Sequence, residues 1–146
     1  MVITGPSGSG MTTLFNMLLK RYPKVFSKPL ETTTRKAKDY ETNGEDFYFV
    51  SEFDFQAMAD KGDFLTWNPV QENFYGTSLE AVERVMDSGK VAIFDLPLDK
   101  LEAYRKSPLE IKYLFISPPS LDALEDRYAK GTVCFIRLPI RLLPHS

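Results

Sequence analysis

The sequence predicts an α/β fold with a largely parallel sheet. Short apolar stretches that are typical of strands alternate along the chain with stretches of helical periodicity. A loop rich in glycine and serine, residues 5–10, stands between the first such strand and the first helix. With 43% apolar residues in a chain of 146, the sequence has enough apolar surface to bury the core of one domain.

The first half of the chain is predicted to open with a strand and a helix. Leu14, Met17 and Leu18 recur on one face of a helix over residues 12–22, which Pro23 ends. The other elements expected here, in chain order, are a strand at 1–4, an extended threonine-rich stretch at 29–35, a charged loop at 36–46, an aromatic strand at 47–50, a helix at 52–61 and a strand at 64–70.

The second half continues the alternation. Gly76 predicts a turn at residues 73–77, and Ser78 is the expected N-cap of a helix that runs to Asp87. The elements expected after it are a buried strand at 91–96, a helix at 98–106, a strand at 111–117 and a helix at 121–130. Residues 133–146 are apolar but fit neither periodicity. They are expected to pack as an irregular C-terminal arm, or to mark a departure from a longer ancestral sequence.

Composition excludes several classes of function. The 18 basic and 20 acidic side chains give a net charge of −2, so neither nucleic acid nor a membrane surface is an expected partner. With one cysteine, Cys134, and one histidine, His145, the chain can build neither an intrachain disulfide nor a His/Cys zinc cluster. The first residues do not resemble a signal peptide, and no run approaches the roughly 18 apolar residues of a membrane span. These features predict a cytoplasmic protein.

The sequence Gly-Pro-Ser-Gly-Ser-Gly-Met-Thr at residues 5–12 has the spacing of a phosphate-binding loop. Glycines let main-chain N–H groups converge on phosphate oxygens, and the following helix adds its dipole. The residues expected to contact the phosphates are Gly5, Ser7, Gly8, Ser9, Gly10, Thr12 and Thr13. Met11 stands where such loops carry a lysine, and a thioether supplies no charge. A turn that merely opens a helix is the alternative interpretation.

A carboxylate follows the buried strand in the second half of the chain. Val91–Phe94 are apolar and Asp95 comes directly after them. An aspartate in this position beside a phosphate-binding loop is typical of Mg²⁺ sites, so Thr12 and Asp95 are the candidate metal ligands. The alternative is an ordinary aspartate at a strand end that caps the following helix.

Taken together, these segments resemble the guanylate kinase family over residues 1–132. The resemblance rests on five stretches: GPSGSGMTTL (5–14), TTRK (33–36), NGEDFYFVS (43–51), NFYGTS (73–78) and FISPPSLDALEDR (115–127). It implies a three-layer nucleoside-monophosphate-kinase fold, with residues 1–29 and 81–132 as the core. It also implies a small mixed-β GMP-binding subdomain at 30–80. The family continues after the helix at 121–130 with a mobile lid, but this sequence shows no recognisable lid or C-terminal end there, and 133–146 is interpreted as a divergent arm. Members of the family transfer the γ-phosphoryl group of ATP to GMP with Mg²⁺.

The resemblance assigns the acceptor site residue by residue. For the GMP phosphate, Arg35 and Tyr75 match family residues, Lys38 replaces an arginine, and Glu41 matches an acidic position; Thr77 matches the hydroxyl residue that contacts guanine. Arg35 and Asp95 are the expected catalytic residues. Arg127 and Lys130 stand near the start of the lid, where they either contact phosphate or belong to a solvated helix face.

Several positions depart from the family pattern. Besides Met11, they are Glu31 at a serine, Phe47 at a tyrosine, and Thr66 and Pro97 at the two carboxylates that pair with guanine. These departures predict a guanylate kinase-like protein whose conversion of ATP and GMP to ADP and GDP is weak or lost. Two alternatives remain open: a non-catalytic module that binds a phosphopeptide or a protein partner, and a fragment or frame-shifted product of a longer gene.

Overall fold

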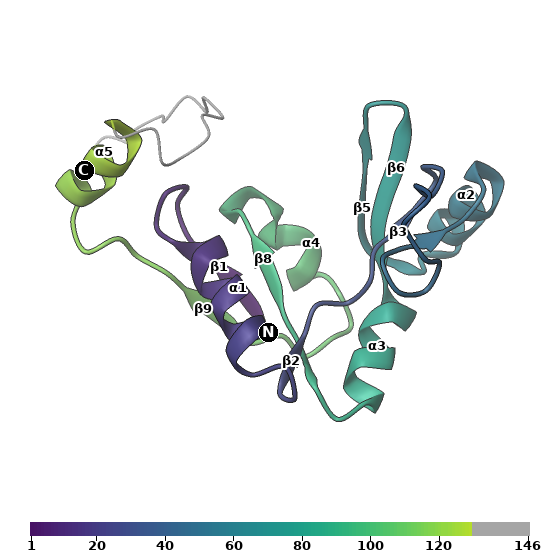
Figure 1. Ribbon diagram of the computed structural model, residues 1–146, viewed down its shortest axis with the longest axis horizontal. Coiled ribbons are helices and arrows are strands. Elements are labelled where there is room, and N and C mark those ends of the chain that lie inside the picture. Colours follow the sequence, from purple (N-terminus) through teal and green to yellow (C-terminus); the bar gives the residue numbers. More distant parts are fainter. Residues whose placement is uncertain (130–146) are drawn as a thin grey trace.

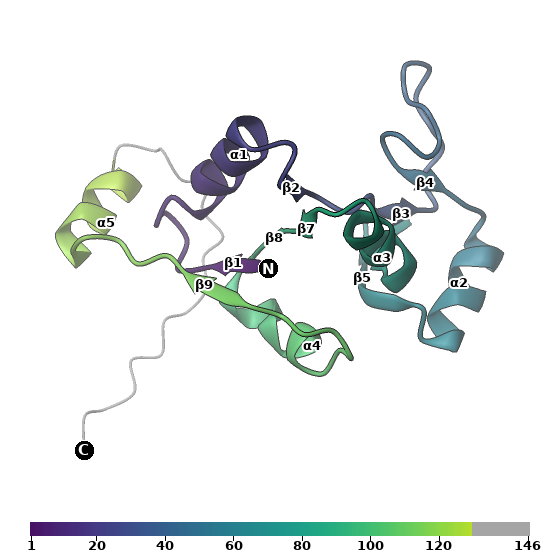
Figure 2. The same ribbon diagram turned by 90° about the horizontal axis from the view of Figure 1, so that it is seen from below.

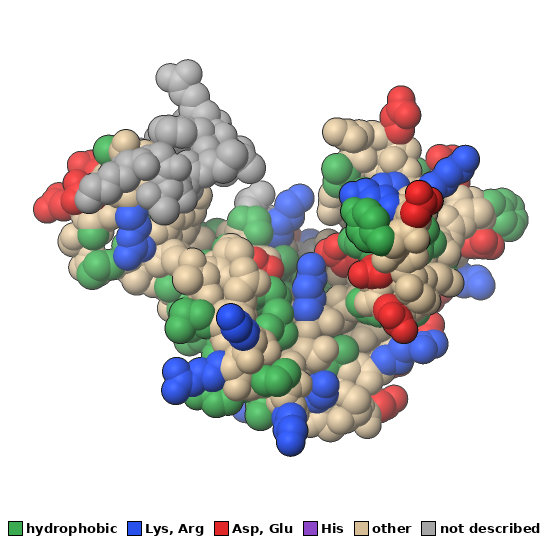
Figure 3. All heavy atoms as spheres, viewed as in Figure 1, with side chains coloured by type: hydrophobic (Ala, Val, Ile, Leu, Met, Phe, Trp, Pro, Cys, Tyr) green, Lys and Arg blue, Asp and Glu red, His purple; other side chains and the backbone are tan. Residues whose placement is uncertain are grey.

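A computed structural model describes residues 1–129 of the protein (Figure 1). The expected arm at 133–146, with Cys134 and His145, and also Lys130, lie outside the described residues. Two groups of elements stand apart in the ribbon view. The first is built around β1, α1 and α4, and the second around β5, β6 and α2. The surface is hollowed between them (Figure 3). None of the described helices is both long and apolar enough to cross a membrane.

The first group is organised by parallel strands, which confirms the predicted α/β fold. β1 (Val2–Thr4) lies between β8 (Phe94–Leu96) and β9 (Tyr113–Phe115), and all three run in the same direction. A second parallel pair joins β2 (Phe26–Ser27) to β7 (Val91–Ala92). α1 (Met11–Arg21) lies on one side of β1, and α4 (Leu101–Arg105) lies on the other, which makes three layers (Figure 2).

The core of this group follows from the alternation of side chains along the strands. Ile3 and Ile93 pack with Phe15 of α1 in one buried cluster. Their strand neighbours Val2 and Phe94 face the opposite side and pack in another cluster. Tyr104 of α4 completes it, with its ring 5.2 Å from that of Phe94. Because successive strand residues point to opposite faces, a short central strand can serve two layers at once.

The second group is a mixed sheet with the strand order β4-β3-β6-β5. β3 (Thr32–Thr33) and β4 (Tyr48–Phe49) are parallel, and β6 (Asn73–Ser78) is antiparallel to both β3 and β5 (Phe64–Val70). α2 (Glu52–Lys61) packs on it through Phe55, whose ring stacks on Phe64 and Phe74 at 4.4 and 5.5 Å. α3 (Leu79–Asp87) follows β6 and begins at the predicted cap, where the Ser78 hydroxyl accepts from the Ala81 N–H.

The predicted turn at 73–77 is wrong, because these residues form β6. The turn of this hairpin lies between β5 and β6, where Gln71 has a positive φ of 55°. Gly76 has another purpose. A Cβ atom there would lie 2.8 Å from side-chain atoms of Phe64 and Trp67, so glycine permits the close approach of β6 to β5. The position of Gly76 does require glycine, but because of close packing between two strands and not because the chain reverses there.

Other elements differ in extent. The strand predicted at 91–96 is divided at Ile93 into β7 and β8, which pair with different neighbours, β2 and β1. β2, only two residues long, was not predicted. The helix predicted at 98–106 is a 3₁₀ turn (Leu98–Lys100) followed by α4. The helix at Glu52–Lys61 and the strand at Phe64–Val70 are confirmed at both ends. The last described helix is α5 (Leu121–Ala129).

Candidate functional site

The loop at residues 5–10 brings the chain from the end of β1 into α1. Gly8 and Gly10 have φ angles of 80° and 97°, in the left-handed region that favours glycine. The turn is closed by the Ser9 N–H, which donates to the Pro6 carbonyl at 3.1 Å. No side chain caps α1, whose N-cap is Gly10. The N–H groups of its first turn therefore remain available to an anion.

Two features of the loop fit a bound phosphate group. A Cβ atom on Gly5 would lie 2.3 Å from the carbonyl oxygen of Ile116, the residue after β9, so the main chain approaches this segment more closely than any residue but glycine allows. Ser9 is only 7% exposed, and its hydroxyl has no hydrogen-bond partner among the described residues. A buried hydroxyl without a partner is costly, and a ligand that accepts its hydrogen bond removes that cost.

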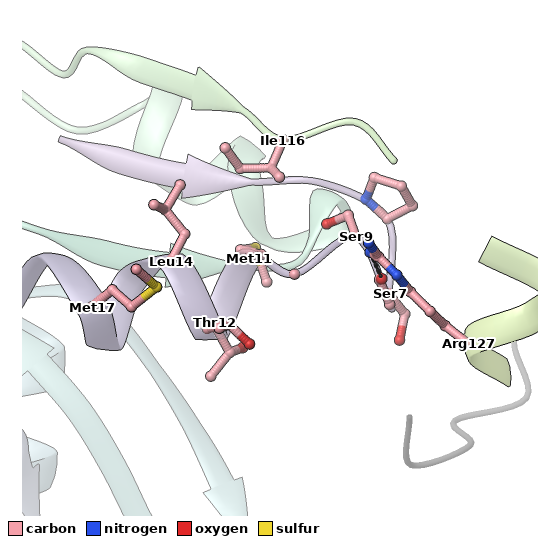
Figure 4. Close-up of a pocket in the computed structure, with 12 residues that line it drawn as sticks. Ser7, Ser9, Met11, Thr12, Leu14, Met17, Ile116 and Arg127 are labelled. Atoms are coloured by element: carbon pink, nitrogen blue, oxygen red, sulfur yellow. Dashed lines mark hydrogen bonds between the residues drawn. The ribbon is translucent and has the colours of Figure 1, made fainter. Parts of the chain in front are cut away.

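Met11 does not contribute its side chain to the loop. It packs against the buried cluster of Ile3, Phe15 and Ile93. In Figure 4 it lies on the side of α1 that faces Ile116, whereas Thr12 lies on the opposite side. A pocket of about 750 Å³ opens over the loop and the start of α1. Position 11 therefore supplies packing to the core and no charge to this pocket.

Thr12 and Asp95 meet, as the sequence predicts. The Thr12 hydroxyl lies 3.4 Å from an Asp95 carboxylate oxygen, although 83 residues separate them. β8 brings Asp95 here, because it pairs with β1 in the register Ile3↔Asp95. Hydroxyl and carboxylate oxygens are ligands that Mg²⁺ prefers, and Mg²⁺ commonly retains several waters. These two side chains fit a magnesium ion that also contacts the phosphates of a nucleotide.

A second cluster of polar side chains is centred on Arg35, in the mixed sheet. Its Nη1 and Nη2 donate to the two carboxylate oxygens of Glu41, both at 2.9 Å, and its Nε donates to the Tyr75 hydroxyl at 3.2 Å. Nη1 also donates to the Lys36 carbonyl at 2.8 Å. Four of the five guanidinium N–H donors are therefore used, which leaves one on Nη2. The ring of Phe47 lies 5.4 Å from the guanidinium carbon.

The electrostatics of the cluster stabilise the charged state of both partners. The bidentate contact with Arg35, with the main-chain N–H of Lys38, lowers the pKa of Glu41 to about 2. The same contact raises the pKa of the Arg35 guanidinium, and the Tyr75 hydroxyl adds to the effect. The Glu41 side chain is 9% exposed and that of Arg35 is 22% exposed. The Arg35–Glu41 pair has no net charge, and it fixes the orientation of the guanidinium.

Lys38 is held less closely. Its main-chain N–H donates to Glu41 at 2.8 Å, but its ammonium group lies 5.6 Å from the centre of the Tyr40 ring. Tyr40 is the main cause of a raised pKa at Lys38. The structure therefore brings Arg35, Glu41 and Tyr75 together through side chains, and Lys38 through its main chain.

Two of the three predicted base-binding positions lie on adjacent strands. Thr77 is buried on β6 and pairs in register with Thr66 on β5. Pro97 precedes the 3₁₀ turn. Neither Thr66 nor Pro97 carries the carboxylate of the family pattern. Glu31, which replaces a family serine, forms an ion pair with Lys28 at 3.8 Å.

α5 contacts the loop through two residues that were not among the predicted site residues. The Arg127 guanidinium donates through Nη1 to the Gly8 carbonyl at 2.8 Å, and the Tyr128 hydroxyl donates to the Ser7 carbonyl at 2.8 Å. In Figure 4 Arg127 extends from α5 toward Ser7 and Ser9. The sequence allowed two interpretations of Arg127, a residue that contacts phosphate or a residue on a solvated helix face. No local pattern could decide, because the loop is 119 residues away along the chain.

Comparisons with known proteins point to one family. A family model described as guanylate kinase matches residues 1–133. The chain is 40% identical over 132 residues to guanylate kinase 1 of Arabidopsis thaliana, an alignment that covers 90% of this chain and 34% of that protein. It is 40% identical over 133 residues to guanylate kinase of Nitratidesulfovibrio vulgaris, covering 90% of this chain and 64% of that protein.

Two further similarities extend the comparison. Guanylate kinase of Campylobacter jejuni is 36% identical over 144 residues, covering 97% of this chain and 70% of that protein, so this alignment continues past residue 133. The solved structure of guanylate kinase from Anaplasma phagocytophilum superposes with a TM-score of 0.51 at 26% identity, covering 87% of this chain and 63% of that one. The chain spans about a third of the length of the plant relative and less than two thirds of the Nitratidesulfovibrio one.

Proposed function

The chain belongs to the guanylate kinase family, and we propose that it binds ATP at the loop of residues 5–12 and GMP beside Arg35, with slow phosphoryl transfer between them. In the transfer, an oxygen of the GMP phosphate forms a bond to the γ-phosphorus of ATP. The bond from that phosphorus to the oxygen bridging to the β-phosphate breaks, and ADP leaves with the electron pair. The products are ADP and GDP.

The donor side of this proposal depends on the main chain. The N–H groups of the loop and of the first turn of α1 hold the phosphates, and the Ser9 hydroxyl gains the partner that it lacks. Gly5, Ser7, Gly8 and Gly10 shape the loop, and Thr13 extends the contacts into α1. Thr12 and Asp95 would hold Mg²⁺, which neutralises charge on the phosphate oxygens.

The acceptor side depends on side chains. Arg35 orients the GMP phosphate through its remaining Nη2 donor, and the Tyr75 hydroxyl lies beside it. Glu41 holds the guanidinium in place, and Lys38 adds positive charge at the edge of the cluster. Thr77 is the proposed contact with the base. Without carboxylates at Thr66 and Pro97, discrimination for guanine is reduced.

The proposed slow rate rests on the packing of the Met11 side chain against the buried cluster of Ile3, Phe15 and Ile93. A lysine at this position reaches the phosphates and offsets charge during transfer. Losing one such group costs roughly 10²–10³ in rate in comparable electrostatic sites. Main-chain binding of phosphate does not depend on that side chain, so we propose that binding survives better than catalysis.

The test is a direct measurement of GDP formation from ATP, GMP and Mg²⁺, with the unmodified chain and its Met11→Lys variant. We expect a slow rate for the first and a rate about 10-fold or more higher for the second, because the lysine stem can follow the core before its ammonium reaches the loop. GDP formation by the unmodified chain at rates typical of kinases, about 1–100 s⁻¹, would refute the proposed impairment.

The alternative of a non-catalytic module that holds a phosphopeptide or protein partner uses the same Arg35 cluster. The same protein samples, the unmodified chain and its Met11→Lys variant, distinguish this alternative from the kinase proposal. Binding of a phosphopeptide that Arg35→Ala abolishes, without any GDP formation in the Met11→Lys variant, would favour it.

The proposal also includes a cytoplasmic location. We propose that residues 1–29 and 81–132 bind the donor ATP and that residues 30–80 bind the acceptor GMP.

A further inference from the structure

We infer that β9 is an interface between two copies of this chain, which associate by antiparallel pairing of the strand with itself around Leu114. β9 is the outer strand of its sheet, because the strand order is β8-β1-β9. Figure 1 shows it on the side of β1 that faces away from β8. Among the described residues, no second strand pairs with β9 at its free edge.

The side chains of β9 are apolar and all three are exposed. Tyr113 is 42% exposed, Leu114 40% and Phe115 57%. Tyr113 lies beside Val2, whose face of the sheet is covered by α4, and Leu114 lies beside Ile3, whose face is covered by α1. The two helices therefore bury the central strand and leave both faces of β9 exposed. Contiguous apolar surface of this kind is typical of a surface that is covered in an assembly.

The main-chain groups at the free edge of β9 have a symmetric arrangement. The carbonyl of Lys112 and the N–H of Ile116 both bond to β1, at 2.8 and 2.7 Å. Because alternate residues of a strand direct their main-chain groups to opposite edges, those of Tyr113 and Phe115 point away from β1. These two residues, one on each side of Leu114, each present an N–H and a C=O group to the free edge.

This arrangement is complementary to itself. When a second copy approaches with its β9 antiparallel and the two Leu114 residues opposite each other, Tyr113 of each copy lies opposite Phe115 of the other. Each of these pairs then exchanges both of its N–H···O=C bonds, and its two rings meet across the strands. Since one contact satisfies both copies in the same way, the free edge fits a second copy of this chain.

The charges around β9 permit this pairing. The strand itself has no charged residue. In the antiparallel register, Lys112 of one copy lies opposite Ile116 of the other, so the two lysines are about 14 Å apart along the strands. That separation exceeds the screening length of about 8 Å at physiological ionic strength, so the two ammonium groups repel each other little.

β5, the edge strand of the mixed sheet, is protected where β9 is not. β5 contains Pro69, which has no N–H to donate, and its pairing with β6 shifts in register between Phe64 and Thr66. Prolines and bulges are devices by which edge strands avoid pairing with other chains. β9 has no proline, and its register with β1 is regular. The contrast favours β9 as the edge that pairs.

Sedimentation velocity of the full chain without nucleotide, at about 1–100 µM, tests the inference in the range expected for a small interface. The unmodified chain is compared with Leu114→Lys, with Leu114→Glu, and with an equimolar mixture of these two variants. Val70→Lys is the matched control, because Val70 is an apolar residue of the other edge strand, β5, and is 45% exposed. The measurement uses no nucleotide, so its outcome is independent of the proposed kinase activity.

We expect the unmodified chain to form a dimer whose fraction rises with concentration, since a short strand pair makes a small interface. Each charged variant places two like charges opposite each other at the centre, and should weaken association about 10-fold or more. The mixture should restore association to within about threefold of the unmodified chain, because an ammonium group then faces a carboxylate. Val70→Lys should leave association within about twofold.

Four results would overturn the inference: a monomer at every concentration, a dimer that both Leu114 variants retain, an assembly larger than a dimer, or a mixture that does not restore the dimer. A monomer that dimerises only when residues 133–146 are deleted would also overturn it, since that segment would then cover β9 in place of a second copy. If the Leu114 variants do not fold, as judged by circular dichroism, Phe115→Lys replaces them: loss of the dimer supports the inference and its retention contradicts it.

Discussion

The loop at residues 5–12 and the Arg35 cluster handle anions in opposite ways. The loop presents main-chain groups, shaped by Gly8 and Gly10, and tolerates a methionine where a lysine is expected. The Arg35 cluster presents side chains whose positions depend on one another, since Glu41 and Tyr75 hold the guanidinium. Replacing one side chain at the loop is expected to slow the reaction and leave the binding geometry in place. Replacing one side chain of the Arg35 cluster is expected to disturb the positions of the other side chains.

The largest effect is expected at the side-chain site. Arg35→Ala should lower kcat/KM for GMP by about 100-fold or more, because it removes the phosphate contact and leaves the Glu41 carboxylate, on a side chain only 9% exposed, without its cation. The measurement is made in the Met11→Lys background, where turnover is easiest to follow. The affinity for ATP should remain unchanged. A parallel loss of that affinity would show that the two regions are not separable.

The main-chain site should fail when its backbone is crowded. Gly5→Ala places a Cβ atom 2.3 Å from the Ile116 carbonyl oxygen. Moving the loop away from β9 should cost about 1–3 kcal/mol of unfolding free energy and weaken ATP binding. Denaturant unfolding and calorimetry measure both effects. Gly62→Ala is the control for a strained glycine outside the loop: its φ is 76°, but no atom lies within 4 Å of the new Cβ. It should lower stability and leave ATP affinity unchanged.

The base-binding positions should respond to restored chemistry. Thr66→Glu places a carboxylate on β5 opposite Thr77, where it can accept the N–H groups of guanine. We expect the preference for GMP over AMP to rise about 10-fold, measured as the ratio of kcat/KM values in the Met11→Lys background. Thr66→Gln, which has the same length and no charge, is the control. Equal ratios for the two variants would mean that position 66 does not contact the base.

The smallest effect concerns pH. The pKa of Glu41 is lowered to about 2 in the folded protein, from a usual value of 4.5. The Arg35–Glu41 contact therefore stabilises the fold fully above pH 5, and this contribution falls as the pH drops toward 2. The difference in unfolding midpoint between the unmodified chain and Glu41→Gln should shrink over that range. For the exposed Glu102, Glu102→Gln should change the midpoint little at any pH. A constant Glu41→Gln difference across the range contradicts the assignment.

Local signals predicted elements well where the reason for the element was itself local. The helix at Glu52–Lys61 has its cap, Ser51, and its terminating glycine, Gly62, within the segment, and both ends are confirmed. Gly76 was misinterpreted because the cause of that glycine is the Phe64 ring on another strand. The division of residues 91–96 at Ile93 was missed for the same reason, since each half pairs with a different partner.

The same limit applies to the candidate site. The residue types at Thr12 and Asp95 and the spacing of the loop predicted their meeting, because β1 and β8 carry them to the same end of a parallel sheet. The bidentate contact between Arg35 and Glu41 was not predicted, although both residues were, because a turn at residues 36–41 has to bring them together.

By itself the sequence determined the α/β alternation, the glycine loop, the missing lysine and the family, since each of these is stated by residue types at fixed spacing. Only the tertiary structure decided that Met11 faces the core and that Arg127 reaches the loop. The reason is physical. Backbone conformation follows mainly from neighbouring residues, whereas a contact across 119 positions depends on how every intervening element packs.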